Sequence, residues 1–238
     1  VQQNSFAKHQ KGTFFGDFNE MFEQLHGKEI SYNNLLDIDA AVSLIAEFND
    51  PTFAILKHNN ACGLASRDTI VEAWKDALAG DPVSAFGGVL ITNGTVDLAA
   101  AEEINKIFFE VIIAPAYDED ALEVLKQKKN RIILVQKCAN NTQKQFRSIL
   151  NGALVQDRDL KVETAEDLTQ VTKKAVDPAQ VDDLLFANKI TSSLFQLKVL
   201  SGKWKVKVSA LRTNLNHAEG IPQLSIFNYQ LLTHYIFF

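Results

Sequence analysis

Four short apolar runs, separated by helix-like segments, set the fold class of this chain. The runs are residues 53–56, 89–92, 111–114 and 132–135. Continuous apolar runs of this length are typical of strands that are buried on both faces. The segments between them that have helical spacing of apolar residues are 68–78, 98–108 and 118–128. Strands that alternate with helices of about ten residues predict an α/β layer structure with a largely parallel or mixed sheet.

The regions on either side of this alternation predict further elements. Met21, Phe22 and Leu25 fall on one helical face, which predicts a short amphipathic helix over residues 19–28. A second helix is predicted over residues 35–48, because its apolar residues recur at helical spacing and a proline follows it.

The sequence changes character after the last apolar run. Asn151-Gly152 between two apolar segments is a strong signal for a two-residue hairpin, which predicts an antiparallel edge. Residues 159–177 are polar and charged, so we predict a surface connection and place a soft domain boundary there. A helix is predicted over residues 178–189, because proline suits the first helical turn.

Composition excludes several classes of partner. The 24 basic and 29 acidic residues give a net charge of -5, without the basic excess of a nucleic-acid binder. No stretch approaches the roughly 20 apolar residues of a membrane span, and residues 1–4 have no signal-peptide layout. Cys62 and Cys138 lie far apart and form no disulfide framework, which indicates a reducing compartment. We therefore expect a cytoplasmic protein.

The Lys57-His58 pair is the first candidate for chemistry. Both residues follow directly after a predicted buried strand, and Asn59, Asn60 and Gly63 offer a bend behind them. Successive strand side chains point to opposite faces, so the lysine and histidine can converge only if the strand ends there. The carboxyl end of a strand is where α/β sheets usually bind ligands. A solvated lysine beside a capping or core histidine is the alternative reading of the same residues.

Two further segments offer groups for ligand binding. Residues 81–88 end in the glycine pair Gly87-Gly88, whose backbone N–H groups can approach a ligand closely. Glu110 precedes a predicted buried strand, where a carboxylate could accept hydrogen bonds from ribose hydroxyls. Alternatively, residues 81–88 form a tight helix-to-strand connection and Glu110 is an exposed strand terminus.

These segments together resemble a known family. The matching motifs are Lys11-Gly12, residues 31–35, 57–63, 81–88 and 110–116, Ala121-Leu122 and residues 128–130. In this order and spacing, the chain from about Lys11 to Lys189 resembles the AICAR transformylase domain of the bifunctional transformylase/IMP cyclohydrolase family. The resemblance implies a fold similar to cytidine deaminases, with two related subdomains. We expect the first over residues 1–158, and a connection with a partial or divergent second one over residues 159–238.

The resemblance also implies a reaction and its catalytic residues. Family members transfer a formyl group from formyltetrahydrofolate to AICAR, the aminoimidazole carboxamide ribonucleotide, in purine (IMP) biosynthesis, and no metal is required. His58 matches the general base and Lys57 the group that stabilises the oxyanion. A histidine is available as the neutral imidazole near neutral pH. A neighbouring ammonium favours that neutral form and faces the negative oxygen of a tetrahedral intermediate.

Substrate-binding positions carry over in the same way. Asn34, Gly87 and Glu110 match nucleotide-binding positions, with Glu110 standing where some relatives have Asp. Phe86 lies beside them, where it can pack against the substrate ring. The resemblance further implies a homodimer, because sites in this family draw on both subunits.

The chain departs from the family pattern at both ends. The family motif Arg-Tyr-Gly-Glu-Asn-Pro-His-Gln is replaced by residues 4–10, in which only His9 and Gln10 match. A Ser-Asn strand and a Gly-Gln-x-Ser-Arg loop are replaced by residues 191–195 and 205–209. The phosphate-holding Arg and Tyr, the second nucleotide clamp and most of the folate surface are therefore not recognisable. Nothing in the chain resembles the amino-terminal cyclohydrolase domain.

Two rival functions follow from these residues. A zinc deaminase requires His-x-Glu and Pro-Cys-x-x-Cys. His58 has Asn60 at the position of the glutamate, and Cys62 has no second cysteine at the required spacing, so the metal ligands are missing. The other rival is a degenerate or truncated homologue that keeps the fold and binds nucleotide without turnover, and the lost motifs favour it.

Overall fold

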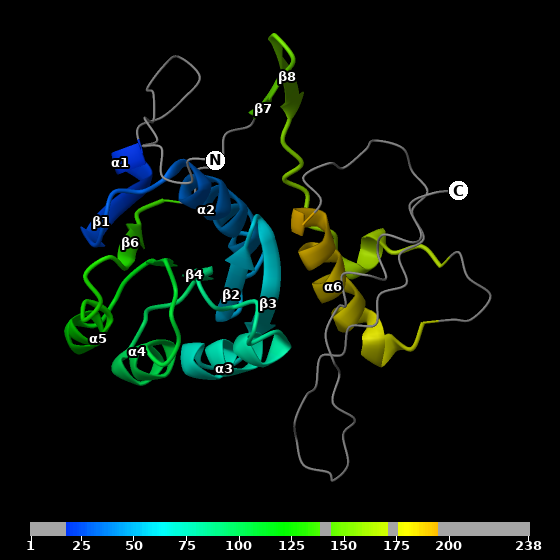
Figure 1. Cartoon of the computed structure of the whole chain (residues 1–238). Coiled ribbons are helices and arrows are strands. Elements are labelled where there is room, and N and C mark those ends of the chain that lie inside the picture. Colours follow the sequence, from blue (N-terminus) through cyan, green and yellow to red (C-terminus); the bar gives the residue numbers. More distant parts are fainter. Residues whose placement is uncertain (1–17, 139–143, 171–175, 195–238) are drawn as a thin grey trace.

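The structure, a computed structural model, describes residues 18–138, 144–170 and 176–194 of the chain (Figure 1). The expectations on residues 4–12 and 195–238 lie outside these ranges. None of the described helices is long and apolar enough to cross a membrane.

Six strands form one mixed sheet in the order β1-β6-β5-β4-β2-β3. The strands are β1 (Phe22–His26), β2 (Thr52–Lys57), β3 (Asn60–Ser66), β4 (Val89–Thr92), β5 (Val111–Ala114) and β6 (Ile132–Gln136). The central strands β4, β5 and β6 run parallel, while β1, β2 and β3 are antiparallel to their neighbours. The predicted α/β class with a mixed sheet is confirmed, and four strands match the four apolar runs.

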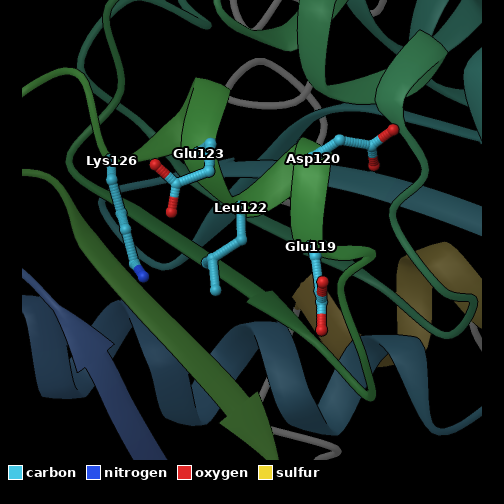
Figure 2. Close-up of a pocket in the computed structure, with 5 residues that line it drawn as sticks. All are labelled: Glu119, Asp120, Leu122, Glu123 and Lys126. Carbon is cyan, nitrogen blue, oxygen red and sulfur yellow. The ribbon is translucent and has the colours of Figure 1, made fainter.

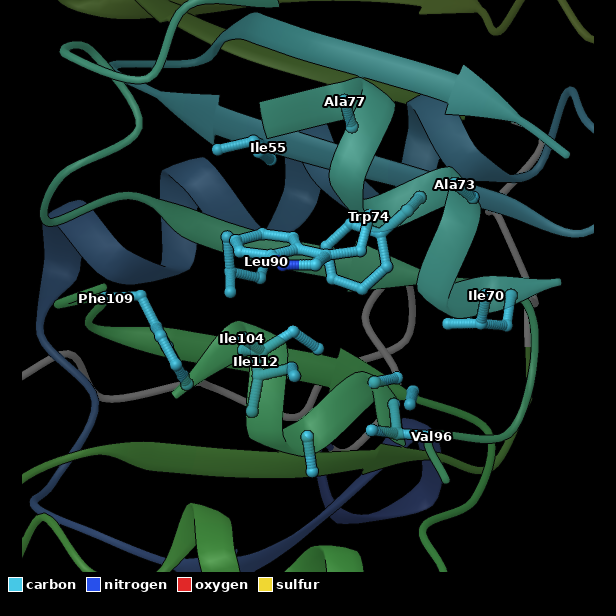
Figure 3. Packing of buried hydrophobic residues seen from close by; sticks show 14 of the residues in the cluster. Ile55, Ile70, Ala73, Trp74, Ala77, Leu90, Val96, Ile104, Phe109 and Ile112 are labelled. Atoms are coloured by element: carbon cyan, nitrogen blue, oxygen red, sulfur yellow. The ribbon is translucent and has the colours of Figure 1, made fainter. Parts of the chain in front are cut away.

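Helices cover both faces of this sheet. One face carries α3 (Ile70–Gly80), α4 (Leu98–Ile104) and α5 (Glu119–Leu125), and the other carries α2 (Tyr32–Ile45), against which α6 (Val181–Leu194) packs (Figure 1). Alternate side chains of β2 point into two hydrophobic cores, one on each face of the sheet. Phe53 packs edge-on against Trp74 of α3, with ring centroids 5.0 Å apart, while Leu56 faces the α2 side. Figure 3 shows Trp74 within the α3-side core. Burial on both faces therefore fixes the position of β2 in the sheet.

The prediction of a helix over residues 19–28 is wrong. Only a single turn, α1 (Phe18–Met21), is helical, and the chain then enters β1. This strand pairs antiparallel with β6, with Phe22 opposite Gln136, and the Phe22 side chain is buried in the α2-side core. Pairing along the open edge of β6 therefore overrides the local helical spacing.

The prediction of a bend over Asn59, Asn60 and Gly63 is correct only at its start. The chain turns at His58 and Asn59 and then continues as β3, which pairs with β2. Gly63 lies inside β3, at a position where α3 passes so close that only glycine fits. A Cβ atom at Gly63 would lie 1.9 Å from the backbone oxygen of Ala77.

The predicted hairpin is present as β7 (Lys144–Ile149) and β8 (Gly152–Asp157), but its two-residue loop is Leu150-Asn151, because Gly152 already pairs with Ile149. The hairpin forms a separate two-stranded sheet and not an edge of the main sheet. The helices predicted over residues 98–108 and 118–128 are shorter, because the chain turns back after Ile104 and Leu125 to reach the next strands. The polar connection contains the short helix η1 (Ala165–Asp167), and η2 (Pro178–Gln180) leads into α6 where a helix was predicted.

Candidate active site

Lys57 joins the end of β2 to the glycine turn over residues 81–88. Its Nζ donates a hydrogen bond to the backbone oxygen of Phe86 at 2.8 Å. The turn is held at its start by Asp81, whose carboxylate accepts the Ser84 hydroxyl at 2.5 Å and the Ser84 amide at 2.9 Å. These two bonds, the hydroxyl first, keep the pKa of the Asp81 carboxyl below its ordinary value. Two segments that the sequence singled out separately are therefore in direct contact.

Two exposed aromatic rings, those of Phe86 and Phe108, lie next to the bond between Lys57 and Phe86. Gly87, which follows Phe86, has a φ of 75° in the left-handed region, where glycine is favoured, and its N–H donates to the backbone oxygen of Phe108 at 2.8 Å. The rings of Phe86 and Phe108 lie 5.3 Å apart and are 60% and 49% exposed. Two exposed rings in contact, tilted by 47° to each other, offer an apolar surface to a ligand.

Glu110 directly precedes β5, which is separated in the sheet from β2, the strand of Lys57, by β4. Its N–H donates to the backbone oxygen of Gly88 at 3.0 Å, which ties it to the glycine turn. Its carboxylate accepts a hydrogen bond from Lys28 Nζ at 3.0 Å. Both side chains are partly exposed, with values of 34% for Glu110 and 43% for Lys28. The sequence analysis missed Lys28, because nothing in the local sequence signals a pairing between residues 82 positions apart.

His58 occupies the two-residue turn between β2 and β3 and is exposed. Its φ is 54° and that of Asn59 is 64°, so both turn residues are left-handed. The turn faces α2, where Asp37 Oδ1 accepts the Asn59 N–H at 2.6 Å. Burial raises the pKa of the Asp37 carboxyl, while the Asn59 amide and the charge of His58 oppose this rise. His58 and Asp37 are therefore electrostatic neighbours, and the sequence analysis did not single out Asp37.

Asn34 lies one helical turn before Asp37 and is 8% exposed. Its side-chain oxygen accepts the Ser31 hydroxyl at 2.8 Å, and its N–H donates to the Ser31 hydroxyl oxygen at 3.2 Å, which forms a capping box at the start of α2. The structure therefore gives Asn34 a helix-capping role. The nitrogen of its side-chain amide, Nδ2, takes no part in these contacts.

The strand ends that meet at the site do not all have the same polarity. The carboxyl end of β2 is involved, as predicted, but β4 runs antiparallel to β2, with Leu56 opposite Val89. Lys57 and His58 therefore lie where the carboxyl end of β2 meets the amino ends of β4 and β5. The rule that ligands bind at carboxyl ends of parallel strands does not describe this arrangement.

Two surface hollows lie elsewhere. The first lies along α5 and is lined by Glu119, Asp120, Leu122, Glu123 and Lys126, as Figure 2 shows. The second lies at the carboxyl ends of β4 and β6 and includes Thr92, Asn93 and Lys137. Neither hollow includes Lys57 or His58, so neither lies at the strand end where we expected ligand binding. In the part of the chain that the structure describes, no group of three His, Cys, Asp or Glu residues is arranged to hold a metal ion.

Comparisons with known proteins place this arrangement in context. A family model described as "AICARFT/IMPCHase bienzyme" matches residues 5–195. The Bifunctional purine biosynthesis protein PurH of Bacteroides thetaiotaomicron is 69% identical over 197 residues, which is 83% of this chain and 39% of the relative. The proteins of the same name from Chlorobium chlorochromatii and Caldicellulosiruptor saccharolyticus are 48% and 44% identical, over 73% and 77% of this chain. The chain covers 34% to 39% of the length of these three relatives.

Proposed function

Because the chain belongs to the AICARFT/IMPCHase bienzyme family of purine biosynthesis, we propose that it acts as a phosphoribosylaminoimidazolecarboxamide formyltransferase. The reaction transfers a formyl group from formyltetrahydrofolate to the amine of AICAR. The observation that carries this proposal is the bond from Lys57 to the glycine turn at Phe86, because it joins the proposed catalytic pair to the proposed substrate-binding segment.

The proposed mechanism assigns one task to each member of the pair. The amine nitrogen of AICAR attacks the formyl carbon, a C–N bond forms, and the carbonyl oxygen becomes an oxyanion. Lys57 places its ammonium at the carboxyl end of β2, where it stabilises that charge. His58 takes the proton from the attacking amine. The bond between the formyl carbon and the folate nitrogen then breaks, and that nitrogen is protonated as tetrahydrofolate leaves.

The residues around the pair would hold the nucleotide. Glu110 can accept hydrogen bonds from ribose hydroxyls if it exchanges its exposed pairing with Lys28, which costs little because exposed ion pairs contribute about 0–1 kcal/mol. Gly87 allows close approach of the backbone, and Phe86 offers its exposed ring to the substrate. Asn34 would bind through its amide nitrogen, since its oxygen is engaged in the helix cap.

The wider setting is proposed on the same basis. We propose a cytidine deaminase-like fold with a first subdomain over residues 1–158 and a partial second one over 159–238, assembled as a homodimer in the cytoplasm. Both cysteines are free thiols, in keeping with a reducing compartment. The second candidate is a homologue that binds nucleotide without turnover. The motifs not recognised in residues 4–10, 191–195 and 205–209 favour it.

The test is a turnover assay of the 238-residue chain with AICAR and formyltetrahydrofolate. We expect His58→Ala to lower kcat by roughly 10²- to 10⁴-fold, the usual contribution of a general base. His26→Ala is the matched control, because His26 lies in β1 and contacts the backbone oxygen of Lys128 outside the site. Equal turnover in wild type and His58→Ala would remove His58 from the mechanism. AICAR binding without turnover in any variant would favour the second candidate.

A further inference from the structure

The turn that carries His58 has a left-handed backbone conformation at both of its residues. Lys57 pairs with Asn60 across the β2–β3 hairpin, so His58 and Asn59 are the only residues of the loop. Both have positive φ, which short hairpins of this type require and which glycine adopts most readily. Neither residue is glycine. Left-handed conformations at such residues persist when surrounding structure holds them in place.

Asp37 is the group in contact with this turn from another element. The distance of 2.6 Å between Asp37 Oδ1 and the Asn59 nitrogen is short for an N–H···O bond, as expected for a charged acceptor. The backbone amide of His58 also faces this carboxylate. Asp37 lies on α2, which is anchored in the core by Ile38 and Ala41. A rigid helix therefore presents an acceptor to both residues of the turn.

We propose that Asp37 is a positioning residue that holds the His58-Asn59 turn left-handed and so aims the His58 imidazole at the attacking amine. The inference rests on the proposed function for its catalytic part, while the contact between Asp37 and Asn59 stands independently. Lys57 is aligned separately, through its bond to Phe86. The two members of the pair are thus positioned by two different elements, α2 and the glycine turn.

The test compares four variants of the full chain. Asp37→Ala removes the acceptor, and we expect kcat to fall by roughly tenfold to a hundredfold with little change in KM for AICAR, because a misplaced group is costly in catalysis. Asp37→Asn keeps an oxygen acceptor and should retain kcat within about threefold of wild type. Asn59→Gly combined with Asp37→Ala should restore most of kcat, because glycine needs no support for positive φ. Asp39→Ala, an exposed neighbour on α2, is the matched control.

A second readout does not depend on turnover. Amide hydrogen exchange at Asn59 should accelerate at least about tenfold in Asp37→Ala and remain slow in Asp39→Ala, because only the first loses the acceptor of that N–H. Unchanged Asn59 protection in Asp37→Ala would overturn the proposal. A wild-type kcat in Asp37→Ala alongside an inactive His58→Ala would overturn it too while leaving the proposed function intact. If His58→Ala is as active as wild type, the proposed function and the catalytic part of this inference both fail, whatever the exchange shows.

Discussion

The two hairpins in the described part of the chain, β2–β3 and β7–β8, have loops of the same length in very different surroundings. The β2–β3 hairpin lies in the six-stranded sheet, with five of the six β2 residues buried, and its turn is held by Asp37. The β7–β8 hairpin forms its own sheet, and every residue of β8 is exposed. Its turn residue Leu150 also has a positive φ, of 49°, and is 99% exposed. Only the first hairpin has the surroundings that can fix a catalytic side chain, since a two-stranded hairpin alone is marginally stable.

The largest expected difference between the hairpins concerns packing. Phe53→Ala in β2 should lower the free energy of unfolding by about 3–5 kcal/mol, because it empties a fully buried site against Trp74. Val155→Ala in β8 should stay within about 0.5 kcal/mol, because that side chain is 56% exposed. Urea unfolding of both variants measures the contrast. A large cost for Val155→Ala would show that the second hairpin is packed as well as the first.

The second-largest expected difference between the hairpins is in the rate at which a cysteine in each one reacts with a thiol reagent. Burial raises the pKa of the Cys62 thiol, in β3, to about 11. The reactive thiolate is therefore scarce at pH 8, and its labelling rate should rise with pH towards that value. In a Cys138→Ser background, Cys62 should react roughly a hundredfold more slowly than a cysteine introduced by Leu154→Cys in β8. Similar rates at pH 8 would contradict the effect of burial on the Cys62 thiol.

These contrasts also explain which parts of the structure the sequence predicts. The four apolar runs predict their strands because burial on both faces leaves a local pattern. The β7–β8 hairpin was predicted because Asn151-Gly152 is a local turn signal. The β2–β3 turn was placed only approximately, because the support for His58-Asn59 comes from Asp37, 22 residues away from Asn59. Long-range contacts of this kind leave no signal in a single sequence, and the pairing of Lys28 with Glu110 was missed for the same reason.

A substitution in the loop of the β7–β8 hairpin should have a smaller effect than the difference in labelling rate. Leu150→Gly relieves the left-handed strain at an exposed residue, a cost of roughly 1–2 kcal/mol. We expect amide exchange within β7 and β8 to slow by about fivefold or more, while the midpoint of global unfolding stays the same. Exchange followed by NMR provides the measurement. A rise in global stability instead would mean that this hairpin unfolds together with the main sheet.

The smallest expected effect concerns the glycine turn that contacts Lys57. The folded-state pKa of Asp81 lies below its ordinary value of 3.8, mainly because the Ser84 hydroxyl binds its carboxylate. Its stabilising contribution is therefore complete above that ordinary value and is lost as pH falls through the lower folded-state pKa. The difference in unfolding free energy between wild type and Asp81→Asn should be constant at pH 5 to 6 and shrink at pH 3. A difference that does not change with pH would rule out this role.

The location of the substrate site is tested most directly by titrating AICAR into the isotope-labelled chain and following its amide signals by NMR. The account predicts saturable shifts at Lys57, His58, Gly87 and Glu110, with the β7–β8 signals unchanged. Shifts confined to the β7–β8 hairpin or to the hollow along α5, with none at Lys57 or His58, would contradict it.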